Sequence, residues 1–420
     1  MNDLFCVIGG NAAGLSAAMQ IKRLSPKTHV ILFEKSGLVS YSKCLLPYYL
    51  SGRIEGIDAI SVKPAVFFSD QGIEILQAEV TRIDVRSREV LYIENGRLRT
   101  LRYRKLLLAT GTRYSKPEGE NFFMPVPDDY IRAGELIRAG KIRTAAVIGG
   151  GFAGCETALE LSRVGIAVDL IEKNRVLSLF SPQFAEELKG FLGGNTRMME
   201  NTDFLGTDGE LLRTSRFERK YDAAFFCLTP KPSTEMIDIP KMKNGAVRTD
   251  AKCRTENEDI FAAGDCASVT FVNNRTGTMP SAVYANKTGK TAAYSMLSKR
   301  TPGFFASGST MIDLDGIVAA RTGVEEGSVC IVKKLPDSKD DKGRPSGGLI
   351  VLGCSESGII KYGEVFSPGT YALQAVTLLG SFLGRPLNEL IAADIPYAPF
   401  INRVLDPVQA AAFGLLLKIR

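Results

Sequence analysis

Tryptophan is absent from this chain of 420 residues, and histidine occurs only once, as His29. Metal-binding patterns are also missing, because the eight cysteines form no Cys-x-x-Cys pair and stand apart from that histidine. A structural zinc site needs such a cluster of ligands, and a disulfide framework is typical of short secreted chains. We therefore expect no metal site and no disulfide framework, and we expect most of the thiols to be small buried apolar residues.

Long apolar segments and blocks of one charge are missing as well. No uninterrupted apolar run reaches the roughly 18–20 residues that a membrane-spanning helix needs, and the stretch Ala410–Leu417 is too short. The N-terminal residues 1–8 lack a basic segment followed by a cleavable apolar one. The net charge of +6 comes from residues of mixed sign, which argues against nucleic acid and favours an anionic substrate. We expect a cytoplasmic protein without a membrane span.

What the sequence does contain is a glycine-rich βαβ pattern. Leu4–Ile8 is an apolar run typical of a buried strand, and residues 9–14 read Gly-Gly-Asn-Ala-Ala-Gly. An alanine-rich helix is predicted to about Leu24, and Val30–Glu34 reads as the next strand. A strand, a glycine-rich turn, a helix and a second strand together make one nucleotide-binding unit.

The same pattern returns in the middle of the chain. A strand is predicted at Ala145–Ile148, a glycine-rich turn at residues 149–154, a helix to about Val164 and a strand at Ala167–Glu172. With 45% hydrophobic residues, a chain of this length should divide into two or three domains. The predicted fold class is therefore α/β, with two Rossmann-like dinucleotide-binding domains built on mostly parallel sheets. Shorter strands after residue 301 predict an α+β domain at the end of the chain.

The glycines of the first turn have separate tasks. Gly9 permits the tight bend, Gly10 or Asn11 lies where the backbone approaches a pyrophosphate, and Gly14 lets the helix pack closely on the strand. The free N–H groups and partial positive charge at the helix N-terminus favour phosphate. Glu34 stands at the end of the following strand, where a carboxylate accepts the hydroxyls of an adenosine ribose.

The second turn has an acidic residue in the corresponding position. Glu172 follows Gly154 at the end of the next predicted strand. A carboxylate there repels a 2′-phosphate, so NADH is favoured over NADPH. Lys173 and Arg175 lie close enough to bind a phosphate and leave NADPH as the less favoured alternative. Two such sites allow hydride from a nicotinamide to reach a flavin.

The chain resembles the pyridine nucleotide-disulfide oxidoreductase family over nearly its whole length. In that family a strand ending in Ala-Thr-Gly, matched by residues 109–111, closes the first half of the FAD domain, and a later Gly-Asp is matched by Gly264-Asp265. The resemblance implies an FAD-binding domain of residues 1–113 and 243–300 with an NADH-binding domain of residues 114–242 inserted into it. Residues 301–420 then form a C-terminal interface domain, and a homodimer is implied.

The resemblance extends to the residues that hold the two cofactors. Asp265 is expected on the ribitol chain of FAD, with a helix N-cap as the alternative. Phe152 is expected to gate the nicotinamide pocket and Glu156 to orient the carboxamide, the alternatives being core packing and a partner for the helix dipole. The full set of expected cofactor-binding residues is Gly9, Gly10, Asn11, Ala13, Gly14, Glu34, Lys35, Ser42, Lys43, Thr110, Gly111, Gly149, Gly151, Phe152, Ala153, Gly154, Glu156, Glu172, Lys173, Gly264 and Asp265.

One cysteine has the surroundings of a nucleophile. Cys44 follows the first nucleotide-binding unit, in a position that this fold places at a helix start under the flavin. A helix N-terminus and the adjacent Lys43 both favour the thiolate form. Glutathione-reductase-type members carry a second cysteine here, but positions 39 and 49 are Val and Tyr. The residues therefore allow only chemistry with a single cysteine. The alternative to a reactive Cys44 is a buried, inert one.

The stretch around Cys44 is similar to the coenzyme A disulfide reductase and NADH oxidase branch of the family. Residues 40, 44 and 47–49 match its Ser-Phe-x-x-Cys-Gly-x-Pro-Tyr-Tyr pattern, whereas Leu45 replaces Gly and Lys43 stands where Asn is common. A C-terminal motif of that branch, which reaches the partner subunit's site, is matched by Tyr397-Ala398-Pro399 and Asp406-Pro407. Tyr397 is the candidate for assisting proton transfer at Cys44, or else a half-buried interface tyrosine.

Four functions remain open on the sequence. The leading one is an NADH-dependent reductase of a disulfide or persulfide, with a small thiol such as coenzyme A as partner. The second is an NADH oxidase in which Cys44 cycles through sulfenic acid. An electron-transfer reductase for a protein such as rubredoxin is the third, and an NADH-sensing flavoprotein, suggested by the irregular residues 229–233, is the fourth. Peroxidase activity is disfavoured because residues 11 and 12 are Asn and Ala where peroxidase-like members carry a histidine.

Overall fold

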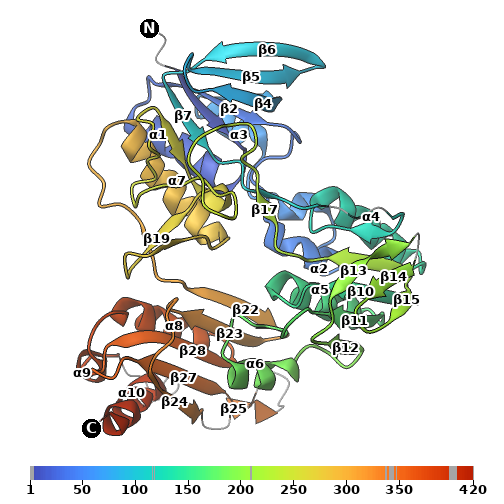
Figure 1. Ribbon diagram of the computed structural model, residues 1–420, viewed down its shortest axis with the longest axis vertical. Coiled ribbons are helices and arrows are strands. Elements are labelled where there is room, and N and C mark those ends of the chain that lie inside the picture. Colours follow the sequence, from blue (N-terminus) through green and yellow to red (C-terminus); the bar gives the residue numbers. More distant parts are fainter. Residues whose placement is uncertain are drawn as a thin grey trace. The chain divides into compact units, whose positions relative to one another are not determined.

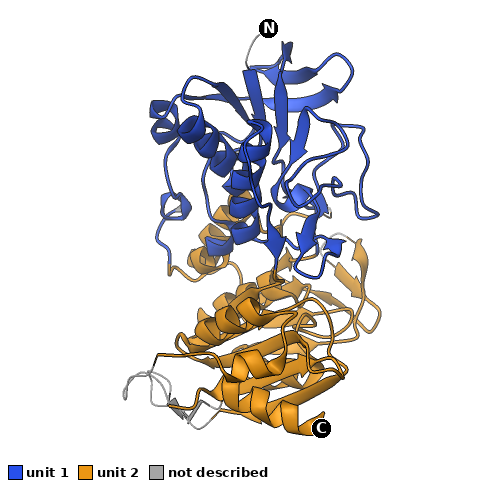
Figure 2. Cartoon of the chain, turned by 90° about the vertical axis from the view of Figure 1, so that its left-hand side faces the viewer, with its two compact units in different colours: residues 1–46, 54–115, 229–306 blue, residues 47–53, 116–228, 307–420 orange. Residues whose placement is uncertain are grey.

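The computed structural model describes residues 4–115, 117, 119–208, 211–335, 338–339, 345–346, 348–396 and 404–419. The chain forms two units (Figure 2): residues 1–46, 54–115 and 229–306 make the first, and residues 47–53, 116–228 and 307–420 make the second. Within the described ranges, no helix has the length and apolar character that crossing a membrane requires.

The first unit is organised around a five-stranded parallel sheet. Its strand order is β18-β7-β1-β2-β3, so the late strand β18 pairs with β7, and β7 pairs with β1 from the beginning of the chain. The strands are β1 (Leu4–Ile8), β2 (His29–Glu34), β3 (Ile73–Gln77), β7 (Lys105–Leu108) and β18 (Ile260–Ala262).

Both faces of this sheet are buried, which explains why its strands are continuously apolar rather than alternating. On β1, Phe5 and Val7 belong to the core that faces α1 (Ala12–Leu24) and α7 (Ala282–Met296), whereas Cys6 belongs to the core on the opposite face. The two helices lie side by side (Figure 1), and a Cβ at Gly289 of α7 would lie 2.2 Å from the carbonyl oxygen of Ala13. Glycine at that position therefore sets how closely α7 approaches α1.

Smaller elements complete the first unit. A three-stranded antiparallel sheet covers the face opposite the helices and supplies buried residues to its core. Its strands are β4 (Glu79–Asp84), β5 (Glu89–Glu94) and β6 (Arg97–Arg102). The other elements are η1 (Lys43–Leu45), η2 (Ile57–Ile60), α3 (Ala65–Asp70), β8 (Thr112–Arg113), β17 (Lys231–Pro232), η3 (Gly264–Cys266), β19 (Val269–Phe271), β20 (Thr276–Gly277) and β21 (Phe305–Ala306).

The second unit contains a parallel sheet of the same kind. Its strand order is β12-β11-β10-β16-β9, and all four pairings are parallel. The strands are β9 (Phe122–Phe123), β10 (Thr144–Ile148), β11 (Ala167–Ile171), β12 (Thr196–Met199) and β16 (Ala223–Phe226), and the helices are α4 (Pro127–Arg138), α5 (Phe152–Arg163) and α6 (Pro182–Lys189). A separate antiparallel sheet consists of β13 (Phe204–Asp208), β14 (Leu211–Thr214) and β15 (Glu218–Lys220).

The end of the chain adds an antiparallel sheet to the second unit. Its order is β22-β23-β28-β27-β24, and helices α8 to α10 share its hydrophobic core. The elements are β22 (Thr310–Leu314), β23 (Ile317–Thr322), β24 (Val329–Lys334), β25 (Ser338–Lys339), β26 (Pro345–Ser346), β27 (Leu349–Cys354), β28 (Ile360–Pro368), α8 (Tyr371–Phe382), α9 (Leu387–Ile391) and α10 (Pro407–Lys418). The predicted α/β class with parallel sheets is confirmed.

The division into FAD, NADH and C-terminal domains stays a prediction. Residues 47–53 belong to the second unit, although they fall inside the range 1–113 that the sequence assigns to FAD binding. This short segment follows Cys44 directly, so the chain passes from one unit to the other next to the candidate nucleophile.

Candidate functional site

The first glycine-rich turn has the close approaches that its glycines predict. Gly9 has φ +109°, and a Cβ there would lie 2.3 Å from the carbonyl oxygen of Ala109. A Cβ on Gly14 would lie 1.9 Å from the carbonyl oxygen of Gly9. Any side chain at either position would collide with backbone, so the turn requires glycine at both. Asn11 is the N-cap of α1, and the carbonyl of Asn11 accepts from the N–H of Leu15 at 3.0 Å.

Glu34 lies directly over this turn. Its carboxylate accepts from the backbone N–H of Gly10 at 2.8 Å and from the backbone N–H and hydroxyl of Ser36 at 2.9 and 2.8 Å. A hollow of about 530 Å³ adjoins it and is lined by Lys35, Ser36, Gln77, Ala78, Glu79, Ile93, Asn95 and Gly96. Lys35 reaches Glu79 at 3.9 Å. The carboxylate and the hollow stand together at the carboxyl ends of β2 and β3, where ligands bind in such sheets.

The second turn repeats the geometry of the first. Gly149 has φ +108°, and a Cβ there would lie 2.5 Å from the carbonyl oxygen of Cys227. A Cβ on Gly154 would lie 1.8 Å from the carbonyl oxygen of Gly149. Gly151 and Ala153, by contrast, are exposed at the beginning of α5. The turn thus holds its strand and helix together while the exposed residues leave the helix N-terminus accessible.

Glu172 corresponds to Glu34. Its carboxylate accepts from the backbone N–H of Gly150 at 2.7 Å and from that of Asn174 at 2.8 Å. The two neighbouring cations have other partners: Lys173 lies 3.3 Å from Asp203, and Arg175 donates to the carbonyl of Phe180 at 2.6 Å.

Four further predicted residues lie near one another in the first unit: Ala13, Lys43, Gly264 and Asp265. Gly264, with φ +75°, packs on Ala13 of α1, and a Cβ at Gly264 would lie 2.9 Å from the Ala13 methyl group. Asp265 is partly buried and accepts from the backbone N–H of Ser281 at 3.1 Å. Burial raises the pKa of Asp265, while the Ser281 N–H and the charge of Lys43 lower it. The aspartate and Lys43 therefore belong to one electrostatic neighbourhood.

The Ala-Thr-Gly segment is fixed by the later part of the chain. Thr110 donates from its hydroxyl to the carbonyl of Ser233 at 2.5 Å, and the carbonyl of Gly111 accepts from the N–H of Ser233 at 3.0 Å. Gly111 has φ +62°. Ser233, the last of the irregular residues 229–233, thus holds this segment in place.

Cys44 lies near the start of a short helical segment, and its place under a flavin stays a prediction. It lies in the 3-10 turn η1, and α2 (Leu46–Leu50) begins two residues later. Proline has no N–H, so Pro47 is accepted in the first turn of a helix and not in its interior. A helix begun at Cys44 would need the missing N–H of Pro47, and this forces the later start. Cys44 is exposed, as is Cys330, and the other six cysteines are buried.

The loop before Cys44 is anchored to the first glycine-rich turn. Ser40 has φ +54°, a conformation that residues other than glycine rarely adopt. Its N–H donates to the carbonyl of Gly10 at 3.0 Å, and its carbonyl accepts from the N–H of Val62 at 2.7 Å. The N–H of Ser42 donates to the carbonyl of Ile60 at 2.9 Å. Strained backbone held by such contacts is typical of functional loops, and nothing in the residue pattern predicted it.

Phe152 and Glu156 lie on the first two turns of α5. The ring of Phe152 stacks on Phe180 with centroids 5.5 Å apart and an interplanar angle of 25°. Burial raises the pKa of Glu156 to about 7, and the charges of Asp313 and Glu160 add to the effect. Tyr397 lies outside the described residues.

The sequence did not single out Glu160. This residue is buried in the middle of α5 and binds Ser51 and Arg53. The available signal was a charged residue in an otherwise apolar helical stretch, Ala158-Leu159-Glu160-Leu161. Such a residue is expected to have a buried partner, but the sequence does not say which.

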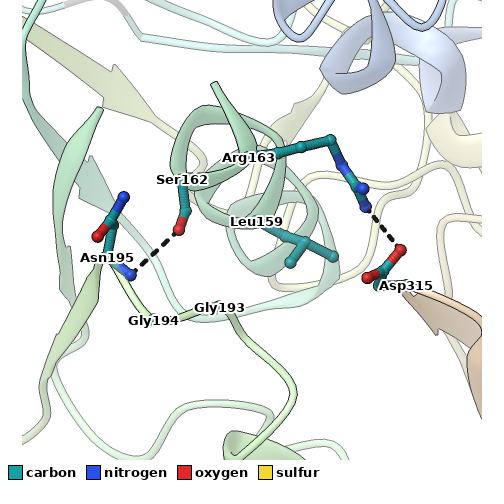
Figure 3. A pocket seen from close by; sticks show the side chains of 7 residues that line it. All are labelled: Leu159, Ser162, Arg163, Gly193, Gly194, Asn195 and Asp315. Carbon is teal, nitrogen blue, oxygen red and sulfur yellow. Dashed lines mark hydrogen bonds and ion pairs between the residues drawn. The ribbon is translucent and has the colours of Figure 1, made fainter. Parts of the chain in front are cut away.

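A second hollow, of about 350 Å³, lies beside α5 and contains none of the predicted site residues (Figure 3). It is lined by Leu159, Ser162, Arg163, Gly193, Gly194, Asn195 and Asp315. Arg163 pairs with Asp315 at 3.0 Å, and the N–H of Asn195 donates to Ser162 Oγ at 3.3 Å. These polar groups satisfy one another, so we assign the hollow no ligand.

The family model of the pyridine nucleotide-disulphide oxidoreductases matches residues 4–289. The chain belongs to this family and is an oxidoreductase; membership implies FAD and NAD(P)H as cofactors.

Relatives and solved structures agree with this assignment. An NAD(P)H sulfur oxidoreductase (CoA-dependent) of Pyrococcus furiosus is 30% identical over 439 residues, which cover 97% of this chain and 97% of that protein. An NADH oxidase of Enterococcus faecalis is 26% identical over 343 residues, 77% of this chain and 76% of that protein. The solved structure of an NAD-dependent persulfide reductase from A. fulgidus is similar with a TM-score of 0.89 and 25% identity, covering 99% of this chain and 83% of that one.

Proposed function

We propose that this chain is an NADH-dependent reductase that cleaves the S–S bond of a small disulfide or persulfide, with a thiol of the coenzyme A type, through Cys44. The observation that carries the proposal is the exposed Cys44, in a loop whose Ser40 N–H donates to the carbonyl of Gly10 in the first nucleotide turn. This contact ties the candidate nucleophile to the candidate flavin site. The sulfur oxidoreductase and persulfide reductase among the similar proteins support the same substrate class.

The residues of the first unit fit FAD. The glycine turn leaves no room for a Cβ at Gly9 or Gly14, so the backbone can approach a pyrophosphate closely, and Glu34 would hold the adenosine ribose. Asp265 would accept from the ribitol hydroxyls. When bound, FAD supplies two-electron chemistry between NADH and a thiol. In the second unit, Gly149, Gly154 and Glu172 would hold NADH in the equivalent manner.

The proposed reaction at Cys44 is thiol–disulfide exchange. The thiolate attacks one sulfur of the substrate, an S–S bond forms between that sulfur and Cys44, and the other sulfur leaves as a thiolate, or as HS⁻ from a persulfide. The hydride of NADH then supplies two electrons and one proton, and solvent supplies a second proton, so that Cys44 returns to the thiolate and both products are released as thiols, or as one thiol and H₂S. For each substrate S–S bond broken, one NADH becomes NAD⁺. Tyr397 remains our candidate for assisting the proton transfer.

NADH rather than NADPH is proposed as the donor. Glu172 lies where the 2′-position of the ribose is expected, and its charge repels a phosphate. The two cations that could bind the 2′-phosphate of NADPH already have partners. Lys173 pairs with Asp203, and Arg175 donates to the carbonyl of Phe180. A phosphate would have to compete with these contacts.

Oxygen is the second candidate acceptor. Cys44 is exposed, and the NADH oxidase of Enterococcus faecalis is among the relatives. In this alternative Cys44 cycles between thiol and sulfenic acid, and two NADH reduce one O₂ to two H₂O.

We further propose a cytoplasmic homodimer formed through the C-terminal part. Thiols persist in a reducing compartment, which suits a chain whose eight cysteines are all thiols. On α10, Phe413 and Leu417 expose 54% and 56% of their surface, and Leu373 of α8 exposes 45%. Phe413 and Leu417 are four residues apart and so are neighbours on one face of α10, and adjoining exposed apolar side chains are typical of contact surfaces.

Anaerobic titration of the purified, FAD-loaded protein with NADH tests the proposal. We expect the flavin absorbance to bleach, followed by oxidation of one NADH for each coenzyme A disulfide or persulfide added. A long-wavelength band from a thiolate beside the flavin would support both Cys44 mechanisms. Bleaching without turnover of any sulfur substrate or O₂ would favour a protein partner as electron acceptor, and no bleaching would favour an NADH sensor.

A further inference from the structure

Glu160 is a carboxylate buried in the middle of a helix. Only 1% of its surface is exposed, and a charge in such a place is tolerated only with good partners. Ser51 donates from its hydroxyl to Oε2, and Arg53 Nη1 lies 2.9 Å from Oε1. Arg163, one turn further along α5, approaches Oε2 to 3.5 Å. Two of the three partners therefore come from outside the helix.

Those two partners belong to the segment 47–53, which is tied to the second unit at more than one point. The hydroxyl of Tyr49 accepts from Arg138 Nη2 at 2.7 Å, and the guanidinium lies 4.8 Å from the centroid of the Tyr49 ring. Arg138 is on α4 and Glu160 on α5. The segment is thus fixed at its tyrosine by one helix and at its serine and arginine by the other.

Cys44 lies three residues before this fixed segment. Between them lie Leu45 and Leu46, and Leu46 is fully buried. Pro47 then restricts the backbone, because its ring fixes φ. With little freedom in the intervening residues, the backbone on the C-terminal side of the thiol is restricted when the segment 47–53 is held.

The helix that holds the segment also carries the residues proposed to face the nicotinamide. Glu156 lies one turn before Glu160 on the same face of α5, at the spacing that makes helical side chains neighbours. The charge of Glu160 contributes to raising the pKa of Glu156. One helix face therefore combines the anchor of the cysteine segment with the proposed nicotinamide contact.

We propose that Glu160 is a positioning residue for the Cys44 thiol and acts through Ser51 and Arg53. It fixes the segment 47–53 to α5 and so restricts the backbone that follows the thiol. The inference rests on the proposed function, because it takes Cys44 as the reacting thiol.

The structure offers a matched control in Glu364. This carboxylate is 0% exposed and, like Glu160, is bound by one serine and one arginine: Ser181 donates to it, and Arg321 Nη1 lies 3.0 Å away. None of these partners belongs to the segment 47–53. Replacing Glu364 by Gln thus removes a buried charge with similar partners without touching the cysteine segment.

The test measures alkylation of the FAD-loaded protein by iodoacetamide, with the modified peptides quantified by mass spectrometry. Cys330 on β24 is the other exposed cysteine and serves as an internal reference. In Glu160→Ala we expect the ratio of Cys44 to Cys330 alkylation rates to fall roughly tenfold, because iodoacetamide reacts with the thiolate and a displaced thiol loses the surroundings that favour this form. In Glu160→Gln this ratio should fall less, because the amide oxygen still accepts from Ser51. In Glu364→Gln the ratio should equal that of wild type.

Three results would overturn the inference. One is an unchanged ratio in Glu160→Ala, and another is an equal fall in Glu364→Gln, which would indicate general loosening. If Glu160→Ala does not retain FAD, Arg53, the partly exposed partner of Glu160, is replaced instead in the variant Arg53→Met. An unchanged ratio of Cys44 to Cys330 alkylation in Arg53→Met is the third result. The proposed function is judged separately by turnover in Cys44→Ser, since alkylation of the thiol needs neither NADH nor a sulfur substrate.

Discussion

The backbone N–H of Gly150 donates to the carboxylate of Glu172 at 2.7 Å, as that of Gly10 does to Glu34 at 2.8 Å. A carboxylate held over each glycine-rich turn can accept ribose hydroxyls without moving.

Changing Glu172 to Ala should shift the cofactor preference toward NADPH. The variant loses charged hydrogen bonds to the ribose, each worth about 1.5–3 kcal/mol, and the repulsion of a 2′-phosphate. We expect the NADH/NADPH ratio of kcat/KM to fall roughly tenfold or more, measured by initial rates with both donors. Glu34→Ala is the matched control and should lower FAD content without altering that ratio. An unchanged ratio in Glu172→Ala would show the assignment to be wrong.

Cys44→Ser should abolish reduction of sulfur substrates while leaving FAD bound and reducible by NADH. The substitution removes the nucleophile with little change in volume. Cys330→Ser, which changes the other exposed thiol, should behave like wild type. Substitution by Ala of a buried cysteine should lower stability more than turnover, as in Cys6→Ala, Cys155→Ala and Cys266→Ala. Wild-type turnover of Cys44→Ser with every disulfide, persulfide and O₂ tested would refute the thiol mechanism.

The two glycine turns should be separable by single alanine substitutions. A Cβ on Gly14 would lie 1.9 Å from the Gly9 carbonyl oxygen, and one on Gly154 would lie 1.8 Å from that of Gly149. We expect Gly14→Ala to lose FAD, and Gly154→Ala to keep FAD but lose reduction by NADH, each with about 1–3 kcal/mol of destabilisation. Gly194→Ala, whose Cβ would meet nothing within 4 Å, should match wild type. FAD absorbance measures cofactor content and its reduction by NADH, and thermal unfolding measures the destabilisation.

Glu156 should make stability depend on pH in a defined window. Burial raises its pKa from 4.5 to about 7, so the folded state keeps the proton more firmly than the unfolded state does. The associated stability is present below pH 4.5 and is lost as the pH rises to about 7. The loss is up to about 3 kcal/mol. In Glu156→Gln this pH-dependent loss of stability should disappear. Urea unfolding of both proteins at pH 4.5 and 7.5 measures the free energies of unfolding that are compared. Equal pH dependence in both proteins would contradict the prediction.

A charged residue on α10 should weaken the proposed dimer. Phe413 exposes 54% of its surface, and Phe413→Glu would place a charge in an apolar contact, which is costly. We expect the variant to sediment as a monomer at concentrations where wild type is a dimer. Leu205→Glu, at a site exposed to 68%, should leave the dimer intact. Wild type that sediments as an active monomer would exclude the dimer.

The sequence by itself determined both nucleotide-binding units. Strand β1 and the end of α1 at Leu24 lie where the pattern of apolar residues put them, because strand and helix periods are local properties of the chain. The two glutamates follow from the same local order of strand, turn, helix and strand. Family motifs added an expected cofactor for each site but no contacts.

Only the tertiary structure decided how Cys44 is held. Its 3-10 turn depends on Pro47, and its upstream loop on the contact of Ser40 with Gly10. Glu160 meets Ser51 across 109 positions of sequence, a pairing that leaves no periodic signature. Local patterns determine which helices and strands form. Contacts between distant residues depend on how these elements pack, and the arrangement around the Cys44 thiol rests on such contacts.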